Sequence, residues 1–185
     1  TVTWAPHIYT DWGWKNFQSW MHAGFDNYLM TPNGLVHRLL TRLSVENLFH
    51  PFQPFMLGQK TIAPRLAAIM DIPLVFYGEN EAEYGNPISD NDSARRNWEY
   101  FSQPDEGSIF IAGTSIEDLK GQFGLEDVDL KPYMPVNPNI IEEKNIDVRY
   151  LGYYISWHPQ GAYYYSVEHG DFQASPERTA GTYSK

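Results

Sequence analysis

Apolar side chains in the first half of the chain recur at two spacings, one typical of β-strands and the other of α-helices. Alternation through residues 1–5 predicts a strand, and a second short strand is expected at 28–30. Between them, Asp11 is the expected N-cap of a helix whose apolar face runs to Gly24. A strand, a helix and a strand in this order are typical of an α/β fold.

The same alternation of element types continues along the chain. Apolar residues four apart predict a helix over 34–49, and a second amphipathic helix over 61–70 is expected to begin at Thr61. The proline-containing segment 50–55 is expected to be a loop, because proline lacks the amide donor that a helix interior needs. Residues 74–77 are nearly all apolar, which predicts a strand buried on both faces. The whole order predicts a parallel sheet flanked by helices.

The second half of the chain has a different composition. Residues 89–108 are mostly polar and are expected to form a loop with at most one short helix. A capping box of Thr114 and Glu117 predicts another short helix. The β-branched and aromatic residues of 147–157 predict a strand, whereas the segment 160–169 fits neither element clearly.

The charge of the chain restricts its partners. Its 185 residues carry 23 acidic and 13 basic side chains, a formal net charge of −10, and no basic stripe. This balance argues against binding to nucleic acid or to an anionic membrane surface. No apolar stretch approaches the roughly 18 residues of a membrane span. Since cysteine is absent, thiolate catalysis and zinc–thiolate sites are excluded as well.

An acidic cluster follows the apolar run 74–77: after Gly78 come Glu79, Glu81 and Glu83. In parallel α/β sheets, ligands bind at the carboxyl ends of the strands, where this cluster falls. Gly78 would let the backbone approach a phosphate closely, and the carboxylates can hold Mg²⁺. A solvated acidic loop explains the same charges, so the spacing leaves both interpretations open.

Two other segments contain residue types suited to ligands. Residues 152–165, GYYISWHPQGAYYY, offer aromatic rings that can stack on sugars or nucleobases, and the same rings would suit an ordinary core. Residues 178–185 combine Arg178 and Lys185 with hydroxyl groups and a glycine, as an anion-binding loop or a loose terminus would. His37 is expected on the solvated face of its helix.

Four long motifs, taken together and in order, make the chain resemble a known family: GENEAEYGNP, YLGYYISWHPQ, YYYSVEHGDF and ERTAGTYSK. They resemble the N-acetyl sugar amidotransferases of bacterial surface-polysaccharide biosynthesis, which act in lipopolysaccharide and pseudaminic-type sugar pathways. The segment PNGLVHRLLTRLSVENLFHPFQPFMLGQK is similar to that family too. The resemblance implies the PP-loop fold of the ATP-pyrophosphatase superfamily (adenine-nucleotide alpha-hydrolase-like), in which a parallel sheet is flanked by helices. It also implies conversion of a sugar acetamido group to an acetamidino group, with ATP, Mg²⁺ and ammonia from a separate glutaminase subunit.

The resemblance also implies roles for individual residues. Gly78 and Asn80 would contact the nucleotide, while Glu79 and Glu83 would hold the metal and serve catalysis. The superfamily's usual pattern here is Gly-His-Asn followed by two aspartates. In this chain Glu79 replaces the histidine, and Ala82 and Glu83 replace the aspartates, so the location is better supported than the metal ligands. Four further residues fall in the family motifs and are assigned to the sugar on the chemistry of their side chains: Tyr153, Tyr154, Trp157 and Arg178.

One family motif is absent from the sequence, the phosphate loop S-G-G-x-D-S, which in the family lies upstream of the strand that here begins at Thr1. We therefore expect a fragment truncated at the N-terminus and inactive by itself, with a partial nucleotide-binding core over 1–88 and a sugar-binding region over 89–185. A cytoplasmic location is expected, where ATP and activated sugars occur. The alternative is a non-catalytic carbohydrate-binding module, suggested by the 16% aromatic residues, and it would require an antiparallel β-sandwich.

Overall fold

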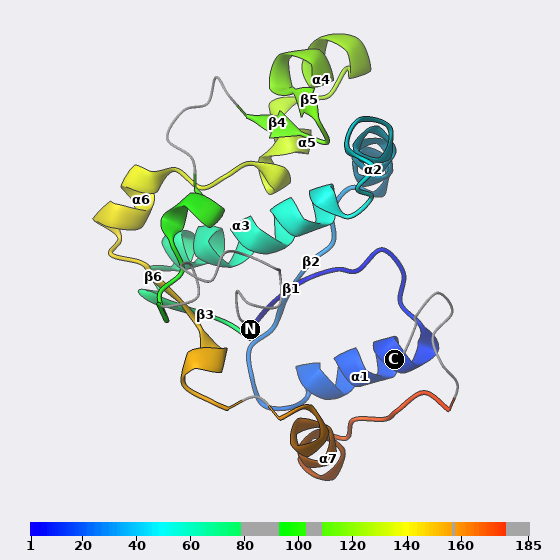
Figure 1. The fold of residues 1–185 in the computed structure, drawn as a ribbon, viewed down its shortest axis with the longest axis vertical. Coiled ribbons are helices and arrows are strands. Elements are labelled where there is room, and N and C mark those ends of the chain that lie inside the picture. The colour runs from blue at the N-terminus through cyan, green and yellow to red at the C-terminus, as the bar shows by residue number, and fades with distance from the viewer. Residues whose placement is uncertain (79–92, 103–108, 157, 177–185) are drawn as a thin grey trace. The chain divides into compact units, whose positions relative to one another are not determined.

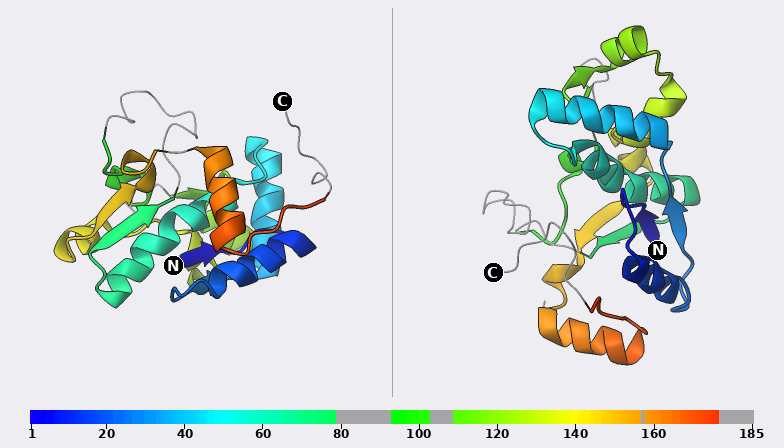
Figure 2. Two further views of the ribbon diagram at one scale, coloured as in Figure 1. Left: turned by 90° about the horizontal axis from the view of Figure 1, so that it is seen from below. Right: turned by 90° about the vertical axis from the view of Figure 1, so that its right-hand side faces the viewer.

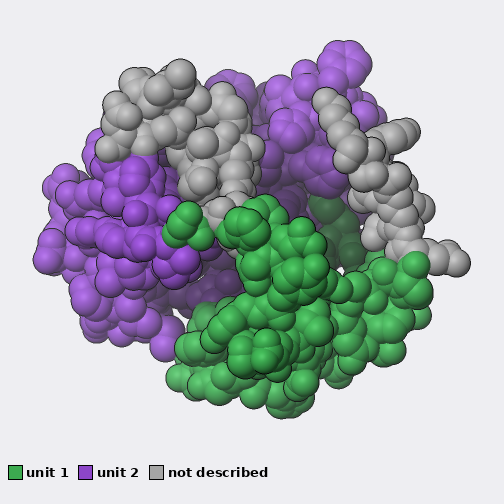
Figure 3. All heavy atoms as spheres, turned by 60° about the horizontal axis from the view of Figure 1, so that its bottom comes forward, with its two compact units in different colours: residues 1, 6–28, 156–185 green, residues 2–5, 29–155 purple. Residues whose placement is uncertain are grey.

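The computed structural model describes residues 1–78, 93–102, 109–156 and 158–176 (Figure 1). Contacts divide the chain into two compact units, coloured in Figure 3. Unit 1 comprises residues 1, 6–28 and 156–185, and unit 2 comprises residues 2–5 and 29–155. The predicted boundary between 88 and 89 concerns function rather than contacts, and it stays a prediction. In the described part of the chain, no helix is both long enough and apolar enough to cross a membrane.

Unit 1 contains helices α1 (Asp11–Met21) and α7 (Pro159–His169) (Figure 1). Thr10 caps α1, because its hydroxyl accepts a hydrogen bond from the Gly13 amide at 3.0 Å, so Asp11 is the first helical residue rather than the cap. The ambiguous segment 160–169 is a helix that begins at Pro159, a favoured first position. None of its residues is buried, so it has no apolar face that a periodicity argument would detect.

Helices α2 (Gly34–Leu48) and α3 (Gln53–Met70) form the centre of unit 2. The structure confirms the first helix. It contradicts the predicted loop over 50–55 and the start at Thr61, since α3 already begins at Gln53. Its first proline, Pro54, lies in the opening turn, where a missing amide donor has no cost.

The second proline of α3, Pro64, lies inside the helix. Its ring nitrogen cannot donate to the carbonyl of Lys60, four residues earlier. That carbonyl instead accepts a hydrogen bond from the Tyr77 hydroxyl at 2.7 Å. A contact from the following strand thus replaces the hydrogen bond that proline removes, and the helix continues past it.

The remaining elements lie in unit 2, except that the first residue of strand β2, Tyr28, belongs to unit 1. The strands are β1 (Val2–Trp4), β2 (Tyr28–Met30), β3 (Leu74–Tyr77), β4 (Phe110–Ile111), β5 (Thr114–Ser115) and β6 (Asp147–Tyr150). The shorter helices are α4 (Ile116–Phe123), α5 (Asp127–Leu130) and α6 (Pro138–Glu143), and the 3₁₀ turns are η3 (Trp98–Tyr100), η5 (Lys131–Tyr133) and η6 (Leu151–Tyr153). Strand β1 pairs with β2, β3 with β6 in parallel, and β4 with β5 in antiparallel.

This mixture of helices and short parallel strands confirms the predicted α/β class. The described residues do not form the antiparallel sandwich that a carbohydrate-binding module would need. Helix α3 packs against α2, β1 and β3, and it runs alongside the β3–β6 pair in Figure 2.

Two predicted boundaries are wrong in detail. The strand expected over 147–157 ends at Tyr150, because the amides of Tyr154 and Ile155 bond to the Leu151 carbonyl and close a turn. The helix cap expected at Thr114 lies one residue later, where the Ser115 hydroxyl accepts a hydrogen bond from the Asp118 amide at 3.1 Å.

Strand β3 is buried on one face only, not on both as predicted. Val75 is buried, whereas Leu74 and Phe76 are 45% and 47% exposed. The prediction assumed helices on both faces of a wide sheet, but among the described residues β3 pairs with β6 alone.

Unit 2 has two buried apolar clusters. Leu40, Ile111 and Leu119 lie at the centre of the first, and Phe101 and Val148 at the centre of the second.

The apolar face expected on α2 packs into the first cluster, with His37 as an unpredicted member. His37, expected on the solvated face, is 8% exposed, and its Nδ1 lies 2.9 Å from the Tyr133 hydroxyl. Val36 and Leu40 are buried beside it, while Leu35 is 70% exposed. Leu43 is buried too and Leu39 packs against the cluster, so the expected face is confirmed except that Leu35 is exposed and His37 is included.

Candidate functional site

The parallel pairing of β3 with β6 places the carboxyl ends of both strands together. Leu74 lies opposite Asp147 at one end of the pair, and Tyr77 lies opposite Tyr150 at the other. Gly78 follows Tyr77 directly, so the first residue of the GENEAEYGNP motif lies at the end of the sheet where α/β proteins bind ligands.

Gly78 stands in open space. Among the described residues, a Cβ added to it would meet no heavy atom within 4 Å, and its backbone is not in the left-handed region that favours glycine. Neither the backbone nor the neighbouring side chains therefore require a glycine at this position. The residue leaves room for a ligand to approach the chain at the strand end.

Most of the other predicted site residues lie outside the described part of the chain: Glu79, Asn80, Glu83, Trp157 and Arg178. Their roles stay predictions. In the ranges that the structure describes, no group of three or more histidine, aspartate or glutamate side chains is arranged to hold a metal.

A buried arginine lies beside the two strand ends, on the core face of the pair. Arg96 is 6% exposed, and its guanidinium carbon lies 4.6 Å from the ring centre of Tyr77, 5.3 Å from that of Tyr150 and 5.5 Å from that of Tyr100. Its backbone amide donates to the Val148 carbonyl at 2.7 Å, which holds it along the edge of β6 that does not pair with β3. Cation–π contacts of this kind are worth about 2 kcal/mol or more when the cation is desolvated.

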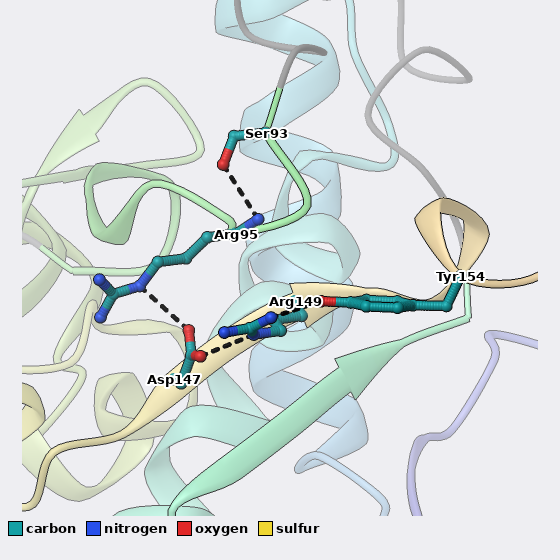
Figure 4. Close-up of polar contacts among 5 residues, drawn as sticks. All are labelled: Ser93, Arg95, Asp147, Arg149 and Tyr154. Atoms are coloured by element: carbon teal, nitrogen blue, oxygen red, sulfur yellow. Dashed lines mark hydrogen bonds and ion pairs between the residues drawn. The ribbon is translucent and has the colours of Figure 1, made fainter.

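The opposite face of β6 carries a second charged group, shown in Figure 4. Asp147 lies between two arginines: its Oδ1 is 3.0 Å from Nε of Arg95, and its Oδ2 is 2.6 Å from Nε of Arg149. Arg149 also donates to the Tyr154 hydroxyl, and the Ser93 hydroxyl accepts from the Arg95 amide at 3.1 Å. The hydrogen bond to Tyr154, and after it in size the hydrogen bond to Asp147, raise the pKa of Arg149. Two guanidinium groups around one carboxylate give this face a net positive charge.

The two tyrosines assigned to the sugar lie next to this group. Tyr154 is 51% exposed, but its hydroxyl accepts a hydrogen bond from Arg149. Its ring centre lies 5.6 Å from that of Phe76, in an edge-to-face arrangement. Tyr153, in the turn after β6, is 39% exposed. The structure thus brings Gly78, Tyr153 and Tyr154 to one end of the strand pair, and the sugar contacts of the tyrosines stay predictions.

A cavity of about 960 Å³ lies beside β6 and the segment 95–101. It is lined by Ser93, by the segment 95–101, by α6 residues, and by Asn145, Ile146, Val148 and Tyr150. This site was not predicted from the sequence, because the composition of residues 89–108 indicates a polar loop. A signal was present: ARRNWEY places two adjacent arginines and two aromatic residues in an acidic chain.

Comparison with known protein families gives no family model that matches this chain. Comparison with curated proteins gives no matching sequence. A function is therefore inferred from the motifs and from the geometry of the strand ends.

Proposed function

We propose that the protein acts as an ATP-dependent N-acetyl sugar amidotransferase of the PP-loop superfamily, in bacterial surface-polysaccharide biosynthesis. The observation that carries the proposal is the register of β3 and β6, which puts Gly78 and the start of GENEAEYGNP at the carboxyl end of a parallel pair. This is the end at which enzymes with parallel sheets bind nucleotides.

The residues at this end suit a nucleotide and its metal. Gly78 leaves space for a phosphate group, and the buried guanidinium of Arg96 supplies a fixed positive charge nearby. The carboxylates of Glu79 and Glu83 are the proposed ligands of Mg²⁺. Such an ion, when bound, neutralises charge on the phosphate oxygens.

The proposed reaction exchanges an oxygen for a nitrogen on the acetamido carbon. The amide oxygen attacks the α-phosphorus of ATP, and the bond to pyrophosphate breaks. Ammonia from the glutaminase partner then adds to the same carbon, and the former amide oxygen leaves as part of AMP. Adenylylation is needed because an amide oxygen is a poor leaving group by itself.

The test uses the complete gene product with ATP, Mg²⁺, ammonium chloride and a panel of N-acetylated nucleotide sugars. The proposal predicts AMP and pyrophosphate in equal amounts, formed only when an accepted sugar is present. Formation of ADP and phosphate, or of AMP without dependence on any sugar, would reject it.

Gly78→Ala tests whether a ligand approaches the strand end. Since no described residue would touch the added methyl group, the variant is expected to fold with unchanged thermal stability but to lose about tenfold or more in sugar-dependent AMP release. Gly121→Ala, inside α4 and equally open, is the matched control and should keep full turnover. Equal turnover of both variants would remove the strand end from the nucleotide site.

A further inference from the structure

The cavity beside β6 has walls that the fold itself holds in place. One wall is the segment 95–101. It is fixed near its start by a hydrogen bond of 2.7 Å from the Arg96 amide to the Val148 carbonyl. At its end, Phe101 is 2% exposed, and its carbonyl accepts from the Val136 amide at 2.9 Å. The volume of about 960 Å³ falls at the upper end of the range for small-molecule sites, which is roughly 300–1,000 Å³.

The lining combines a large aromatic side chain with planar polar groups. Trp98 is 40% exposed, so much of its indole faces away from the core. Asn97, Glu99, Glu142 and Asn145 also line the cavity. Carboxylates accept hydrogen bonds and amides both donate and accept them, which matches the hydroxyl groups of a sugar. An indole offers a flat apolar surface for the C–H face of a sugar ring.

The charges of the lining favour a sugar over a polyphosphate. Arg95 and Arg96 are opposed by Glu99 and Glu142, so cations and anions balance. Arg96 is already enclosed by tyrosine rings, and Arg95 is paired with Asp147 at 3.0 Å. A triphosphate would meet the two carboxylates of Glu99 and Glu142 here, whereas a neutral polyhydroxyl ligand would meet no such repulsion.

The cavity adjoins the proposed nucleotide end of the sheet. Tyr150 lines the cavity and lies opposite Tyr77 in the strand register, and Tyr77 precedes Gly78. A ligand that fills the cavity along β6 therefore extends toward the strand ends.

We propose that this cavity is the binding site of the acetamido sugar, with Trp98 stacked on the sugar ring and Glu142 accepting hydrogen bonds from its hydroxyl groups. The site differs from the sugar contacts expected from the sequence at Tyr153 and Tyr154. The inference rests on the proposed function for the choice of an acetamido sugar among sugars, but binding at this site requires no ATP.

The binding test uses the complete gene product labelled with 5-fluorotryptophan and observed by ¹⁹F NMR. The Trp98→Phe variant assigns the Trp98 resonance by its loss. N-acetylglucosamine, N-acetylgalactosamine and N-acetylmannosamine are the probes. At least one of them is expected to shift the Trp98 resonance saturably while leaving the resonance of Trp4, which is 5% exposed in the other cluster, in place. The proposal would be overturned if the Trp98 resonance did not shift with any of the three sugars, or if it shifted with AMP instead.

A second variant tests the polar contact. Glu142→Gln is expected to weaken binding of the effective sugar about tenfold, as loss of a charged hydrogen-bond acceptor does. Glu143→Gln, on the same helix but outside the cavity lining, should bind as the parent protein does. Equal affinity in both variants would contradict the assignment of Glu142.

The two proposals fail in different ways. If the sugar binds at Trp98 but no sugar-dependent AMP appears, the cavity assignment stands and the amidotransferase is rejected. If AMP release depends on a sugar but Trp98 does not respond to any probe, the amidotransferase stands and the cavity is not its sugar site.

Discussion

The two units of the chain are both rich in aromatic residues, yet they use them in different ways. Unit 2 buries apolar side chains in two clusters, with Leu40, Ile111 and Leu119 fully enclosed. Among the described residues of unit 1, Phe17 is the one buried apolar side chain. Tyr164 and Tyr165 of α7 are 58% and 67% exposed. Aromatic content alone therefore does not indicate a core.

Unit 1 is held together by directional contacts instead. The ring of Tyr9 meets that of Trp14 edge-on at 5.2 Å. The side-chain amide of Asn16 bonds twice to the backbone of Gln173, donating at 2.9 Å and accepting at 2.8 Å. Such contacts stabilise by about 1 kcal/mol each, far less than a filled core does. We expect unit 2 to determine the global stability of the chain and unit 1 to open locally.

The largest expected effect separates the buried and exposed faces of one helix in unit 2. Leu40→Ala leaves a cavity in the first cluster and is expected to lower the free energy of unfolding by about 3 kcal/mol in urea denaturation. Leu35→Ala, five residues earlier and 70% exposed, should change it by less than about 0.5 kcal/mol. Similar losses in both variants would contradict the assigned core face.

The next effect concerns the hydrogen bond that compensates for Pro64. Tyr77→Phe removes the hydroxyl that donates to Lys60 and is expected to destabilise unit 2 by about 1–2 kcal/mol. In a Pro64→Ala background the helix supplies its own amide donor to that carbonyl, so the same change should cost less there. A double-mutant cycle measures the difference. Equal costs in both backgrounds would show that the hydroxyl does not replace the helical bond.

A smaller effect appears as a pH dependence. Burial raises the pKa of Tyr133 from its usual value of 10.0. The folded protein then keeps this proton at a pH where the unfolded chain loses it, so stability is full below pH 10 and falls above it. The expected slope is about 1.4 kcal/mol per pH unit above pH 10, measured by urea denaturation. Tyr133→Phe should lack this component, and an unchanged slope would assign it to other groups.

The smallest effect tests unit 1. Asn16→Ala removes both hydrogen bonds to Gln173 and is expected to cost about 1 kcal/mol, seen as faster amide hydrogen exchange of Gln173 rather than as a loss of global stability. Gln18→Ala on the exposed face of the same helix is the control and should leave this exchange unchanged. A matching fall in global stability for Asn16→Ala would mean that the units unfold together.

The elements that the sequence predicted well are those with a strong local pattern. The helix now bounded at Gly34–Leu48 and the strand Leu74–Tyr77 both follow from apolar spacing. The run of α3 through Pro64 did not, because its hydrogen-bond replacement comes from Tyr77, thirteen positions along the chain. Helix α7 was not predicted because it buries no face.

The candidate site divides in the same way. Gly78 at a strand end was predictable, since an apolar run followed by glycine marks that end. The enclosure of Arg96 was not, because Tyr77, Tyr100 and Tyr150 converge on it from three separate segments. The cavity depends in addition on α6, whose residues carry no ligand-binding motif in the sequence.

The most direct test of the proposed function follows the oxygen atom. The complete gene product is given ATP, ammonium chloride and an accepted sugar whose acetamido oxygen is ¹⁸O, and the products are analysed by mass spectrometry. If the amide is activated by adenylylation, the label appears in AMP and the sugar gains one nitrogen in place of that oxygen. Label found in inorganic phosphate, or retained in the sugar while ATP is consumed, would contradict the account.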